Sequence, residues 1–142
     1  MAKVLVVHGK GMEMRGKEKI EIFGTMTLPE YDEHIRGYAK ELGLDVEIFH
    51  SNVESEVVAK IGQSQGADAI VINPAGYTTG HPALAAALAE ITAPTVEVHV
   101  SNPARRGGVS EIARVTRCAI AGYGVFGYYL ALRGAVELLK AK

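Results

Sequence analysis

The chain has 142 residues, of which 48% are hydrophobic and 22% are charged, and its formal net charge is -1. This size and composition are typical of one globular domain with its own core, so we expect residues 1–142 to form a single domain. The nearly neutral charge argues against nucleic acid as a partner. The sequence shows no secretory leader and no run of about 18 apolar residues, so we predict a soluble, cytoplasmic protein with no membrane partner.

Short β-branched runs alternate with helical patterns along the chain. The runs cover residues 4–7, 46–49, 69–72, 95–100 and 118–121. Each is apolar on both faces, as expected of parallel strands that helices cover on both sides. Five such strands predict an α/β fold of flavodoxin-like type, with a doubly wound parallel sheet in three layers. The same pattern predicts that the one cysteine, Cys118, is a small buried hydrophobe.

Four helices are predicted between and after these runs. Thr27 and Glu30 fit a capping box, so a helix begins there and ends at Gly43. The others are expected over about 54–64, 82–91 and 127–140. Pro94 prevents the third helix from extending further.

In an open α/β sheet, ligands bind beyond the carboxyl ends of the strands. Residues 12–26, after the first strand, form a charged connection long enough to be a lid. Asn73 and the small residues after the third strand let backbone amides approach a ligand. Glu97 and His99 share one face of the fourth strand, because side chains alternate along it. A carboxylate beside an imidazole raises the pKa of that imidazole, as a general acid requires.

Two other motifs are set aside. The sequence GYGVFG at 122–127 matches a dinucleotide-binding fingerprint, but too few residues follow it for the strand and acidic residue that bind the ribose. Its glycines are expected instead to allow tight packing of a strand against a helix. A metal site made of His8, His81 and His99 lacks recognisable ligand spacing. We therefore expect no cofactor and no metal.

Four segments carry a resemblance to a known family: INPAGYT at 72–78, VEVHVSN at 96–102, GYG at 122–124 and GYYLAL at 127–132. With them the chain resembles the type II 3-dehydroquinate dehydratases, flavodoxin-like enzymes of the shikimate and quinate pathways. The resemblance implies a small-molecule substrate and a homo-oligomer built from trimers, a dodecamer. It also implies that a tyrosine, assisted by a lid arginine, removes a proton next to a ketone. A histidine then protonates the hydroxyl that leaves.

The family's motifs assign His99 as the acid, with Glu97 behind it. Substrate contacts are expected from His8, Asn73, Ala75, Gly76, His81, Val100, Ser101 and Arg106. Against the family pattern N-G-P-N-L-N-L-L-G-x-R-x-x-x-x-Y-G, the tyrosine position holds Phe23 and the arginine position holds Glu18. The family's second carboxylate-binding arginine falls on Ser110. A phenyl ring cannot accept a proton, so Glu18 is the candidate catalytic base.

Three functions remain open. The first is a diverged lyase, or a related acid/base enzyme, that acts on a small oxygenated substrate, cyclic or carboxylated. The second is a 3-dehydroquinate dehydratase with a relocated base, and the third is a binding or assembly protein on the same fold. The lid offers Arg15, Lys17 and Lys19 as positive charges for an enolate or a carboxylate. His8 and His81 suggest a rebuilt site, a hypothesis that fails if both point away from the pocket.

Overall fold

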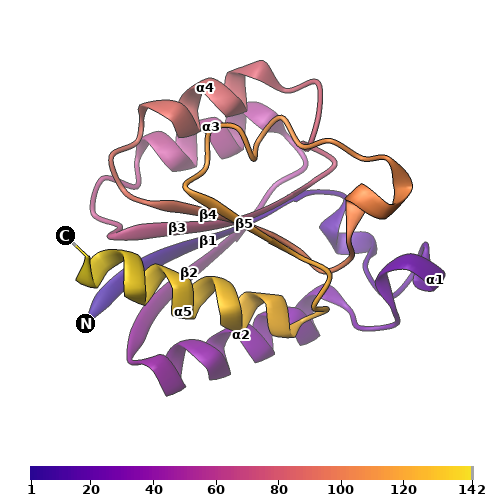
Figure 1. Ribbon diagram of the computed structural model, residues 1–142, viewed down its shortest axis with the longest axis horizontal. Coiled ribbons are helices and arrows are strands. Elements are labelled where there is room, and N and C mark those ends of the chain that lie inside the picture. Colours follow the sequence, from indigo (N-terminus) through magenta and orange to yellow (C-terminus); the bar gives the residue numbers. More distant parts are fainter. Residues whose placement is uncertain (142) are drawn as a thin grey trace.

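The computed structural model describes residues 1–141 and contains a five-stranded sheet of order β2-β1-β3-β4-β5, in which all neighbours are parallel (Figure 1). The strands are β1 (Ala2–Lys10), β2 (Leu44–His50), β3 (Ala69–Ala75), β4 (Thr95–His99) and β5 (Cys118–Ala121). From β1 the chain passes to one edge and then returns to add β3, β4 and β5 on the other side. This order confirms the predicted doubly wound α/β fold.

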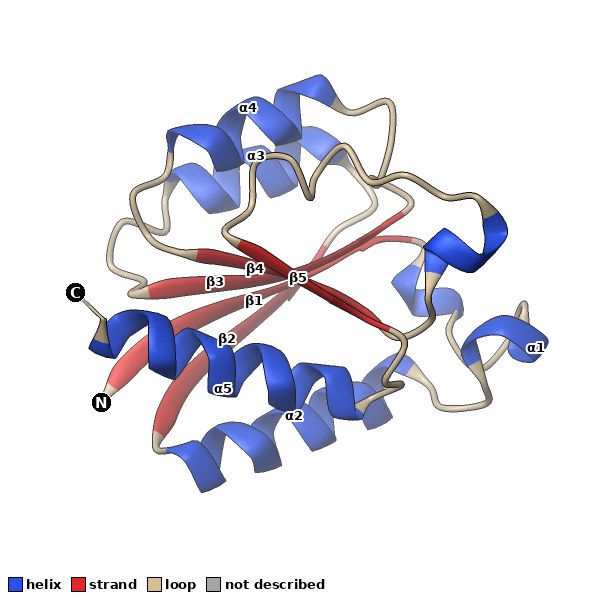
Figure 2. Ribbon diagram, in the orientation of Figure 1, coloured by secondary structure: helices blue, strands red, loops and turns tan. Residues whose placement is uncertain are grey.

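Helices cover both faces of the sheet in three layers (Figure 2). One layer holds α2 (Leu28–Leu42) and α5 (Phe126–Lys140), and the other holds α3 (Glu54–Gly62) and α4 (Pro82–Glu90). Val4 and Val6 of β1 are buried in the core on the α2 and α5 side. The alternate residues Leu5 and Val7 are buried on the opposite side. Burial on both sides explains why the central strands β1 and β3 are largely apolar on both faces.

The predicted helix starts and stops are confirmed most closely for α2. The Thr27 backbone N–H donates to Glu30 Oε1 at 3.1 Å, and Thr27 Oγ1 accepts a bond from the Glu30 N–H at 3.4 Å. The helix ends at Gly43, whose φ of 70° lies in the left-handed region that glycine adopts readily. By contrast α3 ends at Gly62, before Ser64, because Ser64 turns back and donates from Oγ to the Ile61 carbonyl.

Strand β5 lies at the edge of the sheet and pairs only with β4. Three of its four residues are exposed, and Cys118 is one of them. The prediction of a buried cysteine is therefore wrong, because an edge strand this short has a neighbour on one side only. The packing role predicted for the glycines at 122–127 fits Gly127, where a Cβ would lie only 3.2 Å from Val98 Cγ2.

The connection after β1 forms a 3₁₀ helix (Met12–Met14) and the short helix α1 (Ile20–Phe23). In Figure 1, α1 projects at the end of the molecule opposite the two termini, beside the segment after β4. This is the end where the carboxyl ends of the strands lie. Within residues 1–141, no helix has the length and apolarity to cross a membrane.

Candidate functional site

A pocket of about 380 Å³ lies at the carboxyl edge of the sheet, against the lid segment. Its walls come from the end of β1 and the lid, the loop after β3, and the segment after β4. The lining residues are Lys10, Gly11, Met14, Arg15, Glu18, Lys19, Phe23, Ala75, Gly76, Thr78, His99, Ser101, Pro103 and Arg106. Four of these side chains are basic by nature and only Glu18 is acidic, so the pocket suits an anionic ligand.

His99 lies at the last position of β4 and lines the pocket with a side chain that is 11% exposed. Its Nε2 is 3.2 Å from Oε1 of Glu97, whose side chain is only 1% exposed. Ser110 donates from Oγ to the same Glu97 oxygen at 2.5 Å and accepts the Ala113 N–H at 3.1 Å. The structure therefore brings together the pair that strand alternation predicts.

Phe23 lines the pocket next to two guanidinium groups. Cζ of Arg15 lies 3.7 Å from the centre of the Phe23 ring, and Cζ of Arg106 lies 5.9 Å from it. Arg106 is oriented by donating from Nη2 to Ser101 Oγ at 3.1 Å. Burial lowers the pKa of Arg15 from its ordinary value. An arginine nonetheless stays charged, so two permanent cations face this part of the pocket.

The loop after β3 is held against β1 by its backbone. Ala75 has a φ of 47°, and a Cβ added to Gly76 would lie 2.9 Å from the carbonyl oxygen of Lys10. Asn73 stabilises this turn, because its Oδ1 accepts the Ala75 N–H at 3.2 Å. Its Nδ2 donates to the Tyr128 hydroxyl at 3.1 Å. Asn73 is thus buried behind the lining, whereas Ala75 and Gly76 form part of it.

His8 and His81 do not line the pocket. His8 is wholly buried on the same side of the sheet as Val4 and Val6, and its Nε2 lies 2.7 Å from Asp32 Oδ1 in α2. His81 precedes α4, with its Nδ1 3.0 Å from Glu54 Oε1. Each imidazole is satisfied by a helix carboxylate. The expectation that they contact the substrate is not supported, and the hypothesis of a site rebuilt around them fails.

Val100 also departs from the expected set of substrate contacts. Its side chain is 7% exposed and packs in the core on the α2 and α5 side. Strand β4 ends at His99, and the side chain of the next residue, Val100, does not line the pocket. Ser101 and Arg106, which follow it, do line the pocket as expected.

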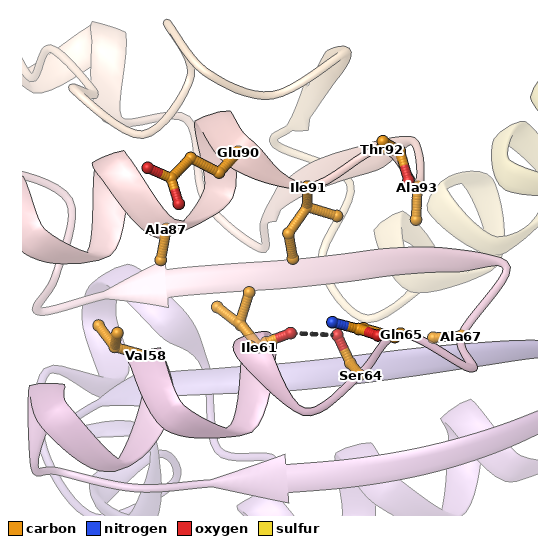
Figure 3. Close-up of a pocket in the computed structure, with 11 residues that line it drawn as sticks. Val58, Ile61, Ser64, Gln65, Ala67, Ala87, Glu90, Ile91, Thr92 and Ala93 are labelled. Carbon is orange, nitrogen blue, oxygen red and sulfur yellow. Dashed lines mark hydrogen bonds between the residues drawn. The ribbon is translucent and has the colours of Figure 1, made fainter.

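A larger hollow of about 650 Å³ lies elsewhere, between the carboxyl-terminal ends of α3 and α4 (Figure 3). Its walls include Ile61, Gln65 and Ile91, and Figure 3 shows Ser64 bonded to the Ile61 carbonyl. Its one ionisable residue is Glu90. The hollow lies near the amino ends of β3 and β4, where open α/β sheets do not place their chemistry. The smaller pocket around His99 is therefore the candidate active site.

Comparison with known proteins identifies the family. A family model described as Dehydroquinase class II matches residues 2–136. The chain belongs to this family. A 3-dehydroquinate dehydratase from Campylobacter hominis is 39% identical, over 97% of this chain and 92% of the relative. One from Desulforudis audaxviator is 40% identical, over 96% of this chain and 94% of the relative.

Solved structures of class II dehydroquinases agree with this assignment. The type II dehydroquinase from Butyrivibrio crossotus superposes with a TM-score of 0.91 at 30% identity, covering 95% of this chain and 97% of that one. A 3-dehydroquinate dehydratase-like protein from Bifidobacterium longum superposes with a TM-score of 0.76 at 32% identity, covering 99% of both chains.

Several residues from the lid and from the end of β1 line the pocket of this class II dehydroquinase. Glu18, the candidate base, and Phe23 both line it. Arg15 and Lys19, which the sequence offers as positive charges for an enolate or a carboxylate, also line it, and so does Lys10, which the sequence does not single out. The signal that points to these three is their place at the end of β1 and in the lid that follows.

Proposed function

We propose that this chain dehydrates 3-dehydroquinate to 3-dehydroshikimate, with Glu18 as the base and His99 as the acid. The observation that carries the proposal is that Glu18 and His99 line one pocket rich in cationic side chains. The names of the relatives from Campylobacter hominis and Desulforudis audaxviator support the substrate. The pocket supplies the three functions that the reaction needs, which are a base, an acid and positive charge.

In this mechanism the Glu18 carboxylate removes a proton from the carbon next to the ketone. The electrons of the broken C–H bond form an enolate, which nearby cations such as Lys10 stabilise. The enolate then expels the hydroxyl on the adjacent carbon while protonated His99 transfers its proton to that oxygen. Water and an enone are formed. Glu18 returns its proton to solvent and His99 regains one, so the protons balance.

Phe23 favours a second candidate, a lyase that acts on a different anionic β-hydroxy carbonyl compound. The ring lies in the lining and carries no ionisable group, so the proton acceptor expected at this position is absent. A changed base is compatible with a changed substrate. The same acid and cations would serve such a compound, because elimination of water needs the same charges.

The test is the ultraviolet absorbance of the enone formed when 3-dehydroquinate is added to the purified protein. We expect turnover in the unmodified protein and a loss of about 10² to 10⁴-fold in both Glu18→Gln and His99→Ala. Glu21→Gln is the matched control, because Glu21 is a lid carboxylate outside the pocket lining. No enone above the His99→Ala background would rule out this substrate and leave the second candidate.

A further inference from the structure

Arg15 is a cation that packs on the Phe23 ring but has no carboxylate partner among the described residues. Throughout the described part of the chain, residues 1–141, no acidic side chain forms an ion pair with it. Its Nε is buried and makes no hydrogen bond, while the residue lines the pocket. A buried charge that lacks a partner is costly, so folded proteins pair such charges or direct them at a ligand. The position of Arg15 in the lining indicates a ligand.

A second arginine, Arg106, also lies near the ring of Phe23. The guanidinium of Arg15 lies close to the ring, at 3.7 Å, and that of Arg106 lies further away, at 5.9 Å. Arg15 comes from the lid and Arg106 from the segment after β4, so the ring connects two distant parts of the chain. Both arginines line the pocket, and an anion bound there would offset the repulsion between their like charges. This arrangement therefore favours a bound anion.

We propose that Arg15 joins Arg106 in binding the carboxylate of the substrate, with Phe23 as the platform on which Arg15 packs. Guanidinium groups donate two parallel hydrogen bonds to a carboxylate, a geometry that an ammonium group cannot reproduce. The hydroxyl of Ser101 already orients Arg106 from the side, at 3.1 Å. This inference rests on the proposed function and makes Arg15 the residue that selects carboxylated substrates.

Binding of quinate tests the proposal without turnover. Quinate has the carboxylate but an alcohol in place of the ketone, so no enolate can form. By calorimetry we expect the unmodified protein to bind quinate at least about tenfold more tightly than its uncharged methyl ester. Arg15→Gln should weaken quinate binding by about tenfold or more and leave the affinity for the ester unchanged. Arg15→Lys should fall between the two, because it keeps the charge and loses the planar fork.

Lys17→Gln is the matched control, since Lys17 is a lid cation outside the pocket lining. It should bind quinate as the unmodified protein does, and circular dichroism should show the same fold for all variants. The proposal is overturned if Arg15→Gln binds quinate normally, or if the unmodified protein fails to prefer quinate over the ester. Enone formation separates the two proposals. Binding of quinate through Arg15 without dehydration of 3-dehydroquinate would end the proposed function alone, and dehydration with no role for Arg15 would end this inference alone.

Discussion

Among single residues, Phe23 allows the choice of Glu18 as the base in the proposed reaction to be tested. It lines the pocket beside the guanidinium of Arg15. In Phe23→Tyr a phenol would enter this cationic surrounding, which lowers the pKa of a tyrosine hydroxyl. We expect the variant to form enone about tenfold faster or more, and to restore turnover when combined with Glu18→Gln. Initial rates across pH measure this. A double variant no faster than Glu18→Gln alone would show that no base operates from position 23.

The sequence predicts part of this site because some of its geometry is local. Strand alternation predicts Glu97 and His99 on one face, and in the structure Nε2 of His99 lies 3.2 Å from Oε1 of Glu97. The same alternation could not tell that His8 faces Asp32, which lies 24 residues further along the chain in α2. For a similar reason the sequence offers Arg15 only as one of three lid cations and does not distinguish it from Lys17 and Lys19. Its importance depends on how Arg15 packs on Phe23 within the lid and faces the pocket, which no local pattern encodes.

Among the elements, β1 and β3 approach most closely near the pocket. A Cβ at Gly9 would lie 2.0 Å from the carbonyl oxygen of Pro74, whereas one at Gly37, inside α2, would meet nothing within 4 Å. We expect Gly9→Ala to lower the free energy of unfolding by about 2 kcal/mol or more, because the strands must separate. Gly37→Ala should raise it by about 0.5 to 1 kcal/mol. Urea unfolding measures both, and equal stabilities would contradict the close approach.

The existence and type of the main elements were predicted correctly, and their ends were less certain. The apolar run predicts a strand over residues 4–7, but the observed strand β1 is longer (Ala2–Lys10). The backbone pairing between strands continues through polar residues such as His8. The run at 69–72 likewise extends to Ala75. Strands end where backbone pairing ends, which the apolar pattern marks only roughly. By contrast α2 has side-chain caps, and there the predicted and observed ends agree.

At the scale of the whole molecule, the winding of the sheet assembles the pocket. The direction in which successive strands are added to the sheet reverses at the neighbouring parallel strands β1 and β3, and Lys10 pairs with Ala75 where these strands end. The connections that leave the two strands therefore begin side by side and diverge, which opens a crevice at this point. His99 reaches it from β4, the next strand. Sequence order alone separates these residues widely, so the doubly wound topology is what makes the site possible.

We also expect the whole fold to lose stability in acid, because carboxylates that cap helices on both faces of the sheet become protonated. The backbone hydrogen bond from Thr27 holds the pKa of Glu30 below its ordinary value of 4.5, at the start of α2. The hydrogen bond to His81 holds the pKa of Glu54 below the same value, and Glu54 also accepts the Leu84 N–H of α4. A carboxyl pKa lowered by folding stabilises the protein above the unfolded pKa, and this contribution disappears as pH falls through the folded pKa.

We therefore expect the urea midpoint to fall between about pH 5 and pH 3, and to fall less in a Glu30→Gln, Glu54→Gln double variant. Glutamine keeps an oxygen acceptor but cannot bind the proton, so the variant should be less stable near neutral pH and closer to the unmodified protein in acid. Glu33→Gln combined with Glu41→Gln removes two exposed charges of α2 and serves as the control. If the Glu30 and Glu54 variant loses as much stability on acidification as the control does, these two caps are not the groups whose protonation weakens the fold.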